Sequence, residues 1–536
     1  MKNNHLDYTA FGGYYQLKLP LELDIHIPAD DPVRLLSAFV EDCSLSALYA
    51  NYGRIRKSQA TPRQLLKIVL YGYMNNLFST RSIETACRRD INFMYLLEGK
   101  KAPDHSTLAR FISKHFAPRA QQILAEMTQF LLAHKEISGK HLFIDGTKIE
   151  SRAGKYTFVW KKAVTKNLQK LFDKIVMFVK ECESQFRLQI VRNRTISLHT
   201  LKRIRKKLYS IKSKEGICFV HGSGKRKKPI QRAIETLESF IERLNDYNYK
   251  IHRCGERNSY SKTDVDATFM RMKEDHMKNG QLKPAYNLQH GVDSEYIVWL
   301  TVSQKPTDTG TLIPFMKSLE KYTAIHYSEV IADAGYESEE NYSYLKQHGH
   351  HAYIKPNNYE ISKTRKYKND IGLAENMQYN IDQDCYYCCQ GKVLTHTGNT
   401  NKKTSSDYIR TTSIYECKHC QGCPDKEKCI RKGNSKIPLE ERNKKLYVSQ
   451  TLKILRQEDE QRIKTAYGKQ LRMNRSIQAE GSFAVIKGDM NFRRYLYNGI
   501  DNVAAQSVLL AMAYNINKLH HKIQDGRCRT YLFSLK

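Results

Sequence analysis

Two short apolar runs, far apart in the chain, each end in an aspartate. The run at residues 142–144 precedes Asp145, and the run at 330–332 precedes Asp333. Apolar runs of this length are typical of buried strands, so each carboxylate is expected at a strand end. The segments between these runs contain helical patterns and further strand patterns. The fold class that satisfies all of them is an α/β sheet interrupted by insertions.

A third acidic residue lies in a helical pattern late in the chain. Glu480 falls within the segment RSIQAEGSFAVIK at 475–487, and Lys487 follows it by seven residues. At about 100° per residue, Lys487 returns to within roughly 20° of Glu480 on the helix face. An exposed lysine is the ordinary interpretation of Lys487. A contact to a DNA phosphate beside the acid is the functional one.

Two strand-end carboxylates and one helical carboxylate can converge on a pair of Mg²⁺ ions. In-line cleavage of a phosphodiester requires an activated attacking oxygen and a stabilised leaving oxygen, and two divalent ions about 4 Å apart serve both. Mg²⁺ prefers carboxylate oxygen and keeps several waters. Three carboxylates therefore suffice when the substrate phosphate supplies further ligands.

Other acids compete with these three, and each has a structural alternative. Asp145-Gly146 is also a hairpin signal, so Asp145 alone can be a turn residue. Asp308 is predicted to cap the helix that begins near Leu312. Spacing does not exclude three further acids: Asp264 and Asp266, predicted as caps of a helix-like segment at 269–270, and Asp293, predicted in a turn between two strands.

The charge of the chain points to an anionic polymer as its partner. Lys and Arg number 88 against 55 Asp and Glu, giving a formal net charge of +33. Nucleic acid is the first candidate, and an anionic membrane is the second. No apolar run approaches the roughly 18 residues that span a bilayer, and the first residues lack the apolar core of a signal peptide. We expect a cytoplasmic, nucleoid-associated bacterial protein that does not enter a membrane.

Basic residues concentrate in helical patterns that are candidates for DNA contact. Short helices follow Thr61-Pro62 and the segments at 79–84 and 103–111, and their basic ends fit helix-turn-helix elements. Residues 160–258 read as an insertion of long amphipathic helices with basic runs at 202–207 and 225–228, for which a helical hairpin is one arrangement. The predicted apolar face carries Leu168, Leu171, Ile175, Phe178 and Val179. Packing helices with solvated charges are the alternative. The predicted DNA contacts are Arg81, Arg110, Lys206, Lys207, Arg226, Lys227, Arg475, Arg493 and Arg494.

Seven of the thirteen cysteines fall between residues 385 and 429. An odd total clustered in this way argues against a secreted disulfide framework. Paired C-x2-C spacing suits a tetrahedral Zn²⁺ site of structural role, with an iron–sulfur cluster as the alternative. A ribbon of 385/388 with 417/420 competes with a set built on 417, 420, 423 and 429. The candidate ligands are Cys385, Cys388, Cys417, Cys420, Cys423 and Cys429.

Several blocks of this sequence resemble the DDE transposases of bacterial insertion sequences. These are FIDGTK around Asp145, IADAGYES around Asp333, AEGSFAVIK around Glu480, and NFRRYLYNG at 491–499. The segments at 61–116, 273–284 and 305–312 also fit, and the closest resemblance is to the family numbered eleven-eighty-two. Relatives often carry Tyr and Arg seven and four residues before the glutamate. Here Met473 and Ser476 stand there, with Arg472 and Arg475 out of phase, so no role is transferred to that pair.

The resemblance implies an RNase H-like catalytic domain whose triad is Asp145, Asp333 and Glu480, together with Lys487. Asp145 is expected on the first strand, Asp333 on the fourth and Glu480 on a late helix. The expected domains are a helical N-terminal DNA-binding domain (1–135), the catalytic core (136–160 and 261–356), a basic helical insertion (161–260), a Cys-rich insertion (357–445) and a C-terminal catalytic helix with a helical tail (446–536).

The expected activity is Mg²⁺-dependent DNA cleavage and strand transfer at the inverted repeats of an insertion sequence. The partners would be double-stranded DNA of the element ends and of the target, bound by a homodimer. Two alternatives remain at this stage. One is an RNase H-like nuclease that cuts without joining, and the other is a catalytically silent DNA-binding regulator derived from a transposase.

Overall fold

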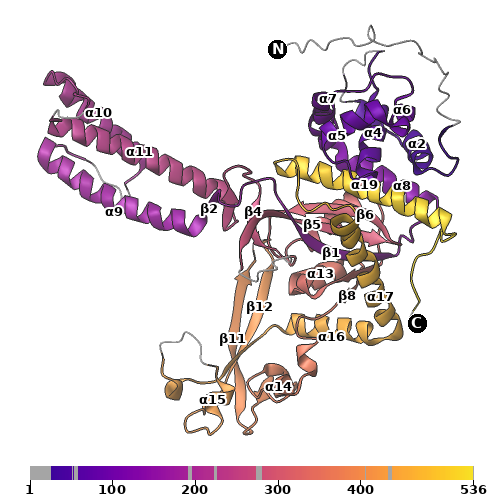
Figure 1. The fold of residues 1–536 in the computed structure, drawn as a ribbon. Helices are drawn as coiled ribbons and strands as arrows, with labels where there is room; N and C mark the ends of the chain where they lie inside the picture. Colours follow the sequence, from indigo (N-terminus) through magenta and orange to yellow (C-terminus); the bar gives the residue numbers. More distant parts are fainter. Residues whose placement is uncertain are drawn as a thin grey trace. The chain divides into compact units, whose positions relative to one another are not determined.

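The structure is a computed structural model, and the ribbon is drawn in Figure 1. It describes residues 26–50, 52, 58–190, 196–222, 226–272, 280–404, 406–431 and 437–534. Lys225 and residues 273–279, which contributed to the sequence patterns above, lie outside these ranges. The chain divides into two units, residues 1–130 with 508–528, and residues 131–507 with 529–536.

The first unit is built from helices in the residues that the structure describes. Helix α4 begins as the sequence predicts: Thr61 caps it through a reciprocal box with Gln64, and Pro62 occupies its first position. Its bounds and those of its neighbours are α2 (Pro32–Asp42), α3 (Ser46–Tyr49), α4 (Pro62–Met74), α5 (Thr80–Arg89), α6 (Ile91–Leu97), α7 (His105–Arg110), η2 (Phe111–Phe116), η3 (Ala117–Arg119) and α8 (Ala120–Ala133).

The second unit contains a mixed sheet in the order β4-β5-β1-β7-β8, with β6 also paired to β5. Strand β1 runs antiparallel to β5 and parallel to β7, and β7 runs parallel to β8. The strands predicted at 142–144 and 330–332 are confirmed as parts of β1 and β7. The strands are β1 (His141–Glu150), β4 (Thr268–Arg271), β5 (Leu282–Asp293), β6 (Tyr296–Ser303), β7 (Glu329–Ala332) and β8 (His351–Ile354).

Three local interpretations of acidic residues give way to tertiary contacts. Asp145 does not form a turn, because β1 continues through it and Gly146, which pair with His290 and Gln289 of β5. The helix-like pattern at 269–270 is part of strand β4. Asp308 does not cap α12 (Leu312–Thr323): its carboxylate accepts hydrogen bonds from Asn287 and Gln289, and Thr311 occupies the cap position.

The basic segment after β1 forms three helices rather than a hairpin: α9 (Lys161–Phe186), α10 (Leu198–Lys214) and α11 (Pro229–Cys254). The short pair β2 (Phe158–Trp160) and β3 (Ser259–Ser261) joins its two ends. The predicted apolar face is confirmed, since Leu171, Ile175 and Val179 belong to one buried cluster. Because all three helices contribute to that cluster, the insertion has a core of its own.

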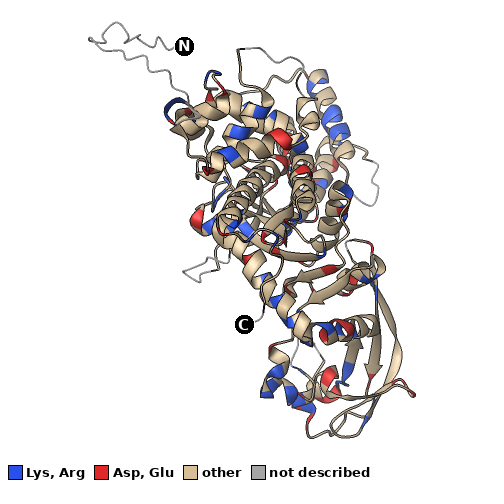
Figure 2. Cartoon of the chain, turned by 90° about the vertical axis from the view of Figure 1, so that its right-hand side faces the viewer, with Lys and Arg blue, Asp and Glu red and all other residues tan. Residues whose placement is uncertain are grey.

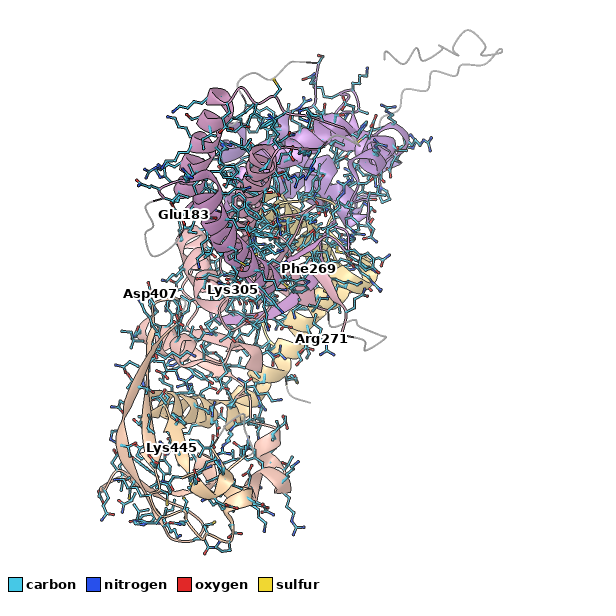
Figure 3. The ribbon with its side chains drawn as sticks, turned by 90° about the vertical axis from the view of Figure 1, so that its left-hand side faces the viewer. Glu183, Phe269, Arg271, Lys305, Asp407 and Lys445 are labelled. Atoms are coloured by element: carbon cyan, nitrogen blue, oxygen red, sulfur yellow. The ribbon has the colours of Figure 1, made fainter. Side chains whose placement is uncertain are left out.

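The cysteine-rich segment contains a five-stranded sheet in the order β13-β12-β11-β10-β9. Its long hairpin reaches the helix α13 (Glu339–Gln347), where Tyr408 donates to Glu339 at 2.9 Å. Asp407 at the hairpin tip and Lys445 near its base are labelled in Figure 3. The elements are η5 (Ile361–Lys363), α14 (Arg365–Lys368), η6 (Ala374–Asn376), β9 (Gln378–Asn380), β10 (Cys385–Tyr387), β11 (Val393–Lys403), β12 (Ile409–Glu416), α15 (Lys426–Cys429), η7 (Leu439–Glu441) and β13 (Lys445–Val448).

The C-terminal part is helical, as the sequence predicts from about residue 450. Its elements are α16 (Gln450–Lys464), α17 (Ala466–Arg475), η8 (Ser476–Glu480), α18 (Gly481–Ala484), η9 (Val485–Asp489) and α19 (Ile500–Gln524). None of the described helices combines the length and apolar character that crossing a membrane requires. Lys and Arg occur along many of the helices, interspersed with Asp and Glu (Figure 2).

The core of the helical insertion gives a testable consequence. Leu237 on α11 is fully buried in the cluster shared by α9, α10 and α11. We expect Leu237→Ala to destabilise the insertion by about 2–5 kcal/mol, because a buried leucine truncated to alanine leaves a cavity. Hydrogen exchange should accelerate in the three helices and stay unchanged in the central sheet. Equal acceleration in both would contradict an independent core.

Candidate active site

The pairing of β1 with β7 brings the two predicted aspartates together. Ile144 of β1 pairs with Ala332 of β7 in the parallel register. Asp145 and Asp333, the next residue after each, therefore lie beside one another on adjacent segments. Paired strands lie about 4.8 Å apart, which puts both carboxylates at the same edge of the sheet. Asp145 is buried and Asp333 is half-buried.

Glu480 comes to this edge from η8 and shares a partner with Asp145. The Arg475 guanidinium lies 2.7 Å from a Glu480 carboxylate oxygen and 3.7 Å from a carboxylate oxygen of Asp145. Glu480 is about half exposed, whereas Arg475 is largely buried. Arg475, which the sequence predicts as a DNA contact, thus stands between two of the three acids and offsets their repulsion.

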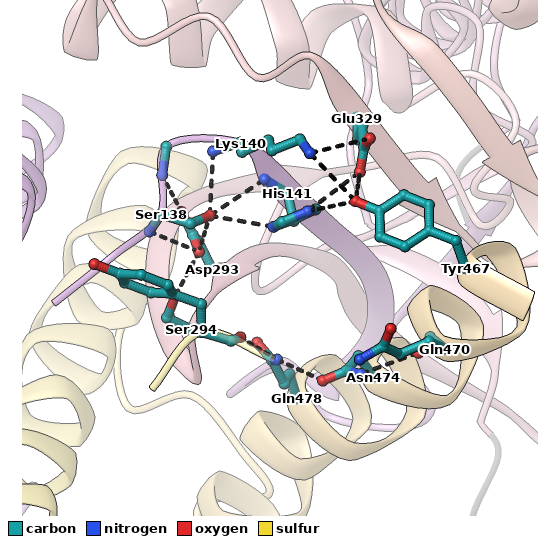
Figure 4. A network of polar contacts seen from close by, with 12 residues as sticks. Ser138, Lys140, His141, Asp293, Ser294, Glu329, Tyr467, Gln470, Asn474 and Gln478 are labelled. Atoms are coloured by element: carbon teal, nitrogen blue, oxygen red, sulfur yellow. Dashed lines mark hydrogen bonds and ion pairs between the residues drawn. The ribbon is translucent and has the colours of Figure 1, made fainter. Parts of the chain in front are cut away.

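A polar network holds the helices that carry Glu480 against the sheet (Figure 4). Gln478 accepts a hydrogen bond from the backbone N–H of Glu295 in the β5–β6 turn, at 2.9 Å. Its amide donates to Asn474 at 3.1 Å. Since Gln478 lies two residues before Glu480, these hydrogen bonds fix the backbone that carries the Glu480 side chain.

A second part of the network joins the first residues of β1 and β7 to α17. Tyr467 donates to Glu329 at 2.7 Å, and its hydroxyl lies 2.8 Å from His141 Nε2. Lys140, His141, Glu329 and Tyr467 point toward one another in Figure 4. The fully buried Asp293 accepts from Ser138 and Gly139. Burial raises the pKa of the Asp293 carboxyl, although these hydrogen bonds oppose the rise. Asp293, one of the competing acids, therefore has a structural role at the turn after β5. It lies at the opposite end of β5 from the residues that pair with β4.

His290 supports the helix beyond Glu480. His290 lies on β5, where it pairs in register with Asp145 of β1. Its Nδ1 lies 3.2 Å from the Ser482 hydroxyl, and its ring stacks on the Phe483 ring with centroids 4.2 Å apart. The imidazole is fully buried, and burial lowers its pKa to about 3. His290 is thus a neutral packing group between the sheet and α18.

A fourth carboxylate, Asp308, adjoins the acids. A Cβ built on Gly146 would meet an Asp308 oxygen at 2.8 Å, and one on Gly335 would meet the other oxygen at 3.4 Å. Tyr336 donates to Gln289, which in turn donates to Asp308. Burial raises the pKa of the Tyr336 phenol well above its ordinary value, and three aspartates raise it further: Asp308, Asp145 and Asp333. The sequence offered no signal for this grouping beyond the glycines.

Lys487 and the two arginines that follow it make backbone contacts. The Lys487 ammonium donates to the carbonyl of Lys148 on β1 at 3.1 Å, which places it beside the strand that carries Asp145. Arg494 donates to the carbonyls of Ser151, Arg152 and Ala153. Arg493 is exposed and donates to the Lys487 carbonyl. The Arg494 guanidinium therefore ties the end of β1 to the segment after η9.

The other predicted DNA contacts lie on helix surfaces. Arg81 on α5 and Arg110 on α7 are exposed, as are Lys206 on α10 and Arg226 before α11. Lys207 is exposed and donates to the carbonyl of Gln189, and Lys227 pairs with Glu235 at 2.7 Å. These residues belong to the N-terminal helices and the helical insertion, and none of them lies next to the three acids in sequence or through a described contact.

The cysteines gather around one small cavity of about 20 Å³. Its lining includes Cys389, which the sequence analysis left out, and excludes Cys385, whose thiol faces Gln383. Burial raises the pKa of the Cys429 thiol to about 11, with opposition from Lys444 and reinforcement from neighbouring thiols. The lining cysteines are Cys388, Cys389, Cys417, Cys420, Cys423 and Cys429.

Two segments of the chain match described families. Residues 387–520 match a family described as a transposase DDE domain, and residues 21–114 match one described as a transposase domain. The first range contains Glu480, Lys487 and the cavity-lining cysteines, and the second contains the N-terminal helices α2 to α7. No curated protein and no solved structure matches the chain.

The neutral, buried His290 predicts a stability that falls in mild acid. The unfolded chain takes up a proton on this residue below about pH 6.5, whereas the folded chain resists protonation until about pH 3. The contribution of His290 to the free energy of unfolding is therefore fully present above pH 6.5. It declines as the pH falls towards 3, by about 1.4 kcal/mol per pH unit. We expect the denaturant midpoint, measured at several pH values between 3 and 6.5, to depend less steeply on pH in His290→Gln than in the intact chain. Parallel slopes would refute this assignment.

Proposed function

Because the chain is a DDE transposase of the insertion-sequence type, we propose that it cleaves DNA at the ends of its own element and joins them to a target. The observation that carries the proposal is the meeting of Asp145, Asp333 and Glu480 at one sheet edge. Asp145 and Asp333 come from adjacent parallel strands, and Arg475 links Asp145 to Glu480.

The strand order supports an RNase H-like catalytic domain. Along the path β6-β5-β1-β7-β8, the first three strands alternate in direction and the last three run parallel. Both aspartates then stand just after the parallel pairing of β1 with β7 ends at Ile144 and Ala332, which is the edge at which open α/β sheets commonly bind ligands. The insertions between the strands leave this order intact.

The donor set at this edge fits divalent magnesium. Its candidate ligands are the carboxylates of Asp145, Asp333 and Glu480, which are hard oxygen donors. The Arg475 guanidinium occupies the position of a compensating cation between two of them. Two bound Mg²⁺ ions would activate the attacking oxygen and stabilise the leaving oxygen of the phosphodiester.

The chain's own residues would position the reacting groups. Gln478 and His290 hold the helix of Glu480 against the sheet. Asp308, held by Asn287 and Gln289, lies beside Gly146 and Gly335, which are close in sequence to the two aspartates. Arg475 now pairs with Glu480 and Asp145. If metal ions were bound by these carboxylates, its guanidinium would be free to contact a DNA phosphate, in agreement with the predicted DNA contact.

A large hollow next to the loop that carries Asp308 has room for DNA as the substrate. It has a volume of about 1510 Å³ and includes Lys305 and Thr309, which flank Asp308. Five further cations line it, Arg253, Arg257, Lys317, Arg410 and Arg456, together with four glutamates, Glu256, Glu337, Glu339 and Glu340. Arg410 and Arg456 pair with Glu339 and Glu337, and the other cations of the lining would contact a phosphate backbone without reading its sequence. The N-terminal helices would then supply recognition of the element ends, in a homodimer.

The cysteine cavity would hold a structural metal ion, and we favour zinc. Thiols crowded in one lining raise one another's pKa, and a bound cation reverses that effect by stabilising thiolates. No three of the described cysteine sulfurs lie within 4.8 Å of one another, so binding would draw the two C-x2-C turns together.

Metal analysis of the purified chain tests the cysteine cavity. We expect Cys420→Ser to lose one zinc equivalent and to become sensitive to proteolysis within residues 378–448, because thiolate ligation ties the turns of that segment. Cys218→Ser is the matched control, since Cys218 is exposed and lies outside the cavity. Iron with the visible absorption of a cluster would establish the iron–sulfur alternative, and unchanged metal content in Cys420→Ser would refute the site.

Cleavage of a duplex carrying the DNA ends that flank the coding region tests the triad. We expect Asp333→Asn to reduce Mg²⁺-dependent cleavage by more than about 10²-fold. Loss of a residue that only supports a metal ligand typically costs about 10–100-fold, and loss of a ligand itself should cost more. DNA binding should persist. Asp407→Asn is the control: Asp407 is exposed at the hairpin tip and should leave cleavage unchanged.

The same assay separates the rival functions. Cleavage that leaves a 3′-OH, followed by covalent joining to a target duplex, is the result expected of a transposase. Cleavage without joining would indicate a nuclease. Specific binding without cleavage by the intact chain would indicate a DNA-binding regulator, and equal cleavage by Asp333→Asn would remove Asp333 from the site.

A further inference from the structure

A second candidate metal site lies away from the three acids. Among the residues that the structure describes, Glu320, His326 and His350 form a trio whose potential ligand atoms all lie within 4.8 Å of one another. Glu320 belongs to α12, His326 to the connection from α12 to β7, and His350 directly precedes β8. Neither the sequence patterns nor the two matched segments include these residues.

The hydrogen bonding of His350 leaves one ring nitrogen facing an acceptor. Its Nδ1 lies 2.6 Å from the carbonyl oxygen of Tyr327. Because a carbonyl oxygen only accepts, Nδ1 carries the proton, and Nε2 of the neutral ring presents a lone pair. That Nε2 lies 3.1 Å from Glu320 Oε1, yet both atoms are buried without a hydrogen-bond partner.

Two opposed lone pairs at this distance require a cation between them. One source is a second proton on His350, but its side chain is fully buried and the His326 ring stacks on it with centroids 4.5 Å apart. A buried imidazolium beside a second basic ring is costly. The other source is a metal ion, for which both lone pairs are already directed inward.

The spacing of the ligand atoms fits a tetrahedral transition-metal ion. Ligands about 2.0–2.1 Å from such an ion lie about 3.3 Å apart. The Glu320 oxygen lies 3.1 Å from His350 Nε2 and 3.7 Å from His326 Nδ1. A histidine ligand whose other nitrogen donates to a backbone carbonyl is the usual support for such sites. His326 is about half exposed, which leaves an entry path.

We propose that Glu320, His326 and His350 bind one Zn²⁺-class ion that fastens the end of α12 to the starts of β7 and β8. Two imidazoles and one carboxylate suit zinc or a neighbouring transition metal, whereas Mg²⁺ prefers oxygen donors. Water would complete the tetrahedron on the exposed side.

The position of the trio makes it a structural clamp rather than part of the acid site. His326 and His350 precede two parallel strands, and Asp333 follows the opposite end of β7. Four strand residues separate the two ends by about 13 Å. Helix α12 follows the loop that carries Asp308, so the ion would hold one end of the element whose other end adjoins the acids.

The local backbone is shaped to present these side chains. Gly349 adopts a φ of +77°, in the left-handed region that glycine favours, and a Cβ there would lie 3.8 Å from the His326 ring. Ala324, two residues before His326, also adopts a positive φ of 53°. These turns bring the segments after α12 and before β8 to the same place.

Titration of the chelator-treated, full-length chain with Co²⁺ tests the site, because Co²⁺ replaces Zn²⁺ and is visible. We expect one equivalent to give d–d absorption without a thiolate charge-transfer band, which separates it from ions bound by cysteines. His326→Ala and Glu320→Gln should each abolish that equivalent. His351→Ala is the matched control, since His351 is exposed, adjacent and outside the trio.

Thermal unfolding gives a second readout that does not depend on DNA cleavage. Zn²⁺ should raise the unfolding temperature of the intact chain and of His351→Ala, and this rise should be smaller in His326→Ala. Full Co²⁺ stoichiometry in both His326→Ala and Glu320→Gln would overturn the proposal. So would a proton shared between His350 and Glu320, seen as an imidazolium by NMR in metal-saturated protein.

Discussion

The structure around the acids depends on β1 being paired along both edges. Its antiparallel partner β5 brings His290 opposite Asp145, and its parallel partner β7 delivers Asp333 to the neighbouring position. A shift of one residue in either register would turn every β1 side chain to the other face. The burial of β1 from His141 to Thr147 specifies the register, and the placement of the carboxylates follows from it.

Carboxylates gathered at one edge repel, and the surrounding groups have to hold them together. Arg475 supplies a positive charge between Asp145 and Glu480. Gln478, anchored to the β5–β6 turn, prevents the helix from moving away from the sheet. The absence of a Cβ at Gly146 leaves space for Gln289 and Asp308 to approach β1 closely. Arg475 and the contact of Gln478 therefore offset the repulsion between the carboxylates and hold them at one edge of the sheet.

The two large insertions are compatible with this arrangement because each buries its apolar residues in a core of its own. The helical insertion returns through the β2–β3 pair, and its apolar residues form a separate cluster. The cysteine-rich sheet has another core, and its hairpin contacts α13 through Tyr408 and Glu339. Neither insertion has to contribute apolar residues to the central sheet, so the strand order is kept although each insertion is roughly the size of a small domain.

The sequence by itself determined the strands around Asp145 and Asp333, the amphipathic face at Leu171–Val179 and the cap at Thr61, because hydrophobic period and capping chemistry are local. It also marked the three acids, through a resemblance to transposases. Only the tertiary structure decided that Asp145-Gly146 continues a strand, that Asp308 turns to Asn287 and Gln289 instead of capping a helix, and that Cys389 replaces Cys385 in the cavity. The same holds for Arg475 and for His350 facing Glu320. These are contacts between residues remote in sequence, and no local pattern encodes which remote groups will meet.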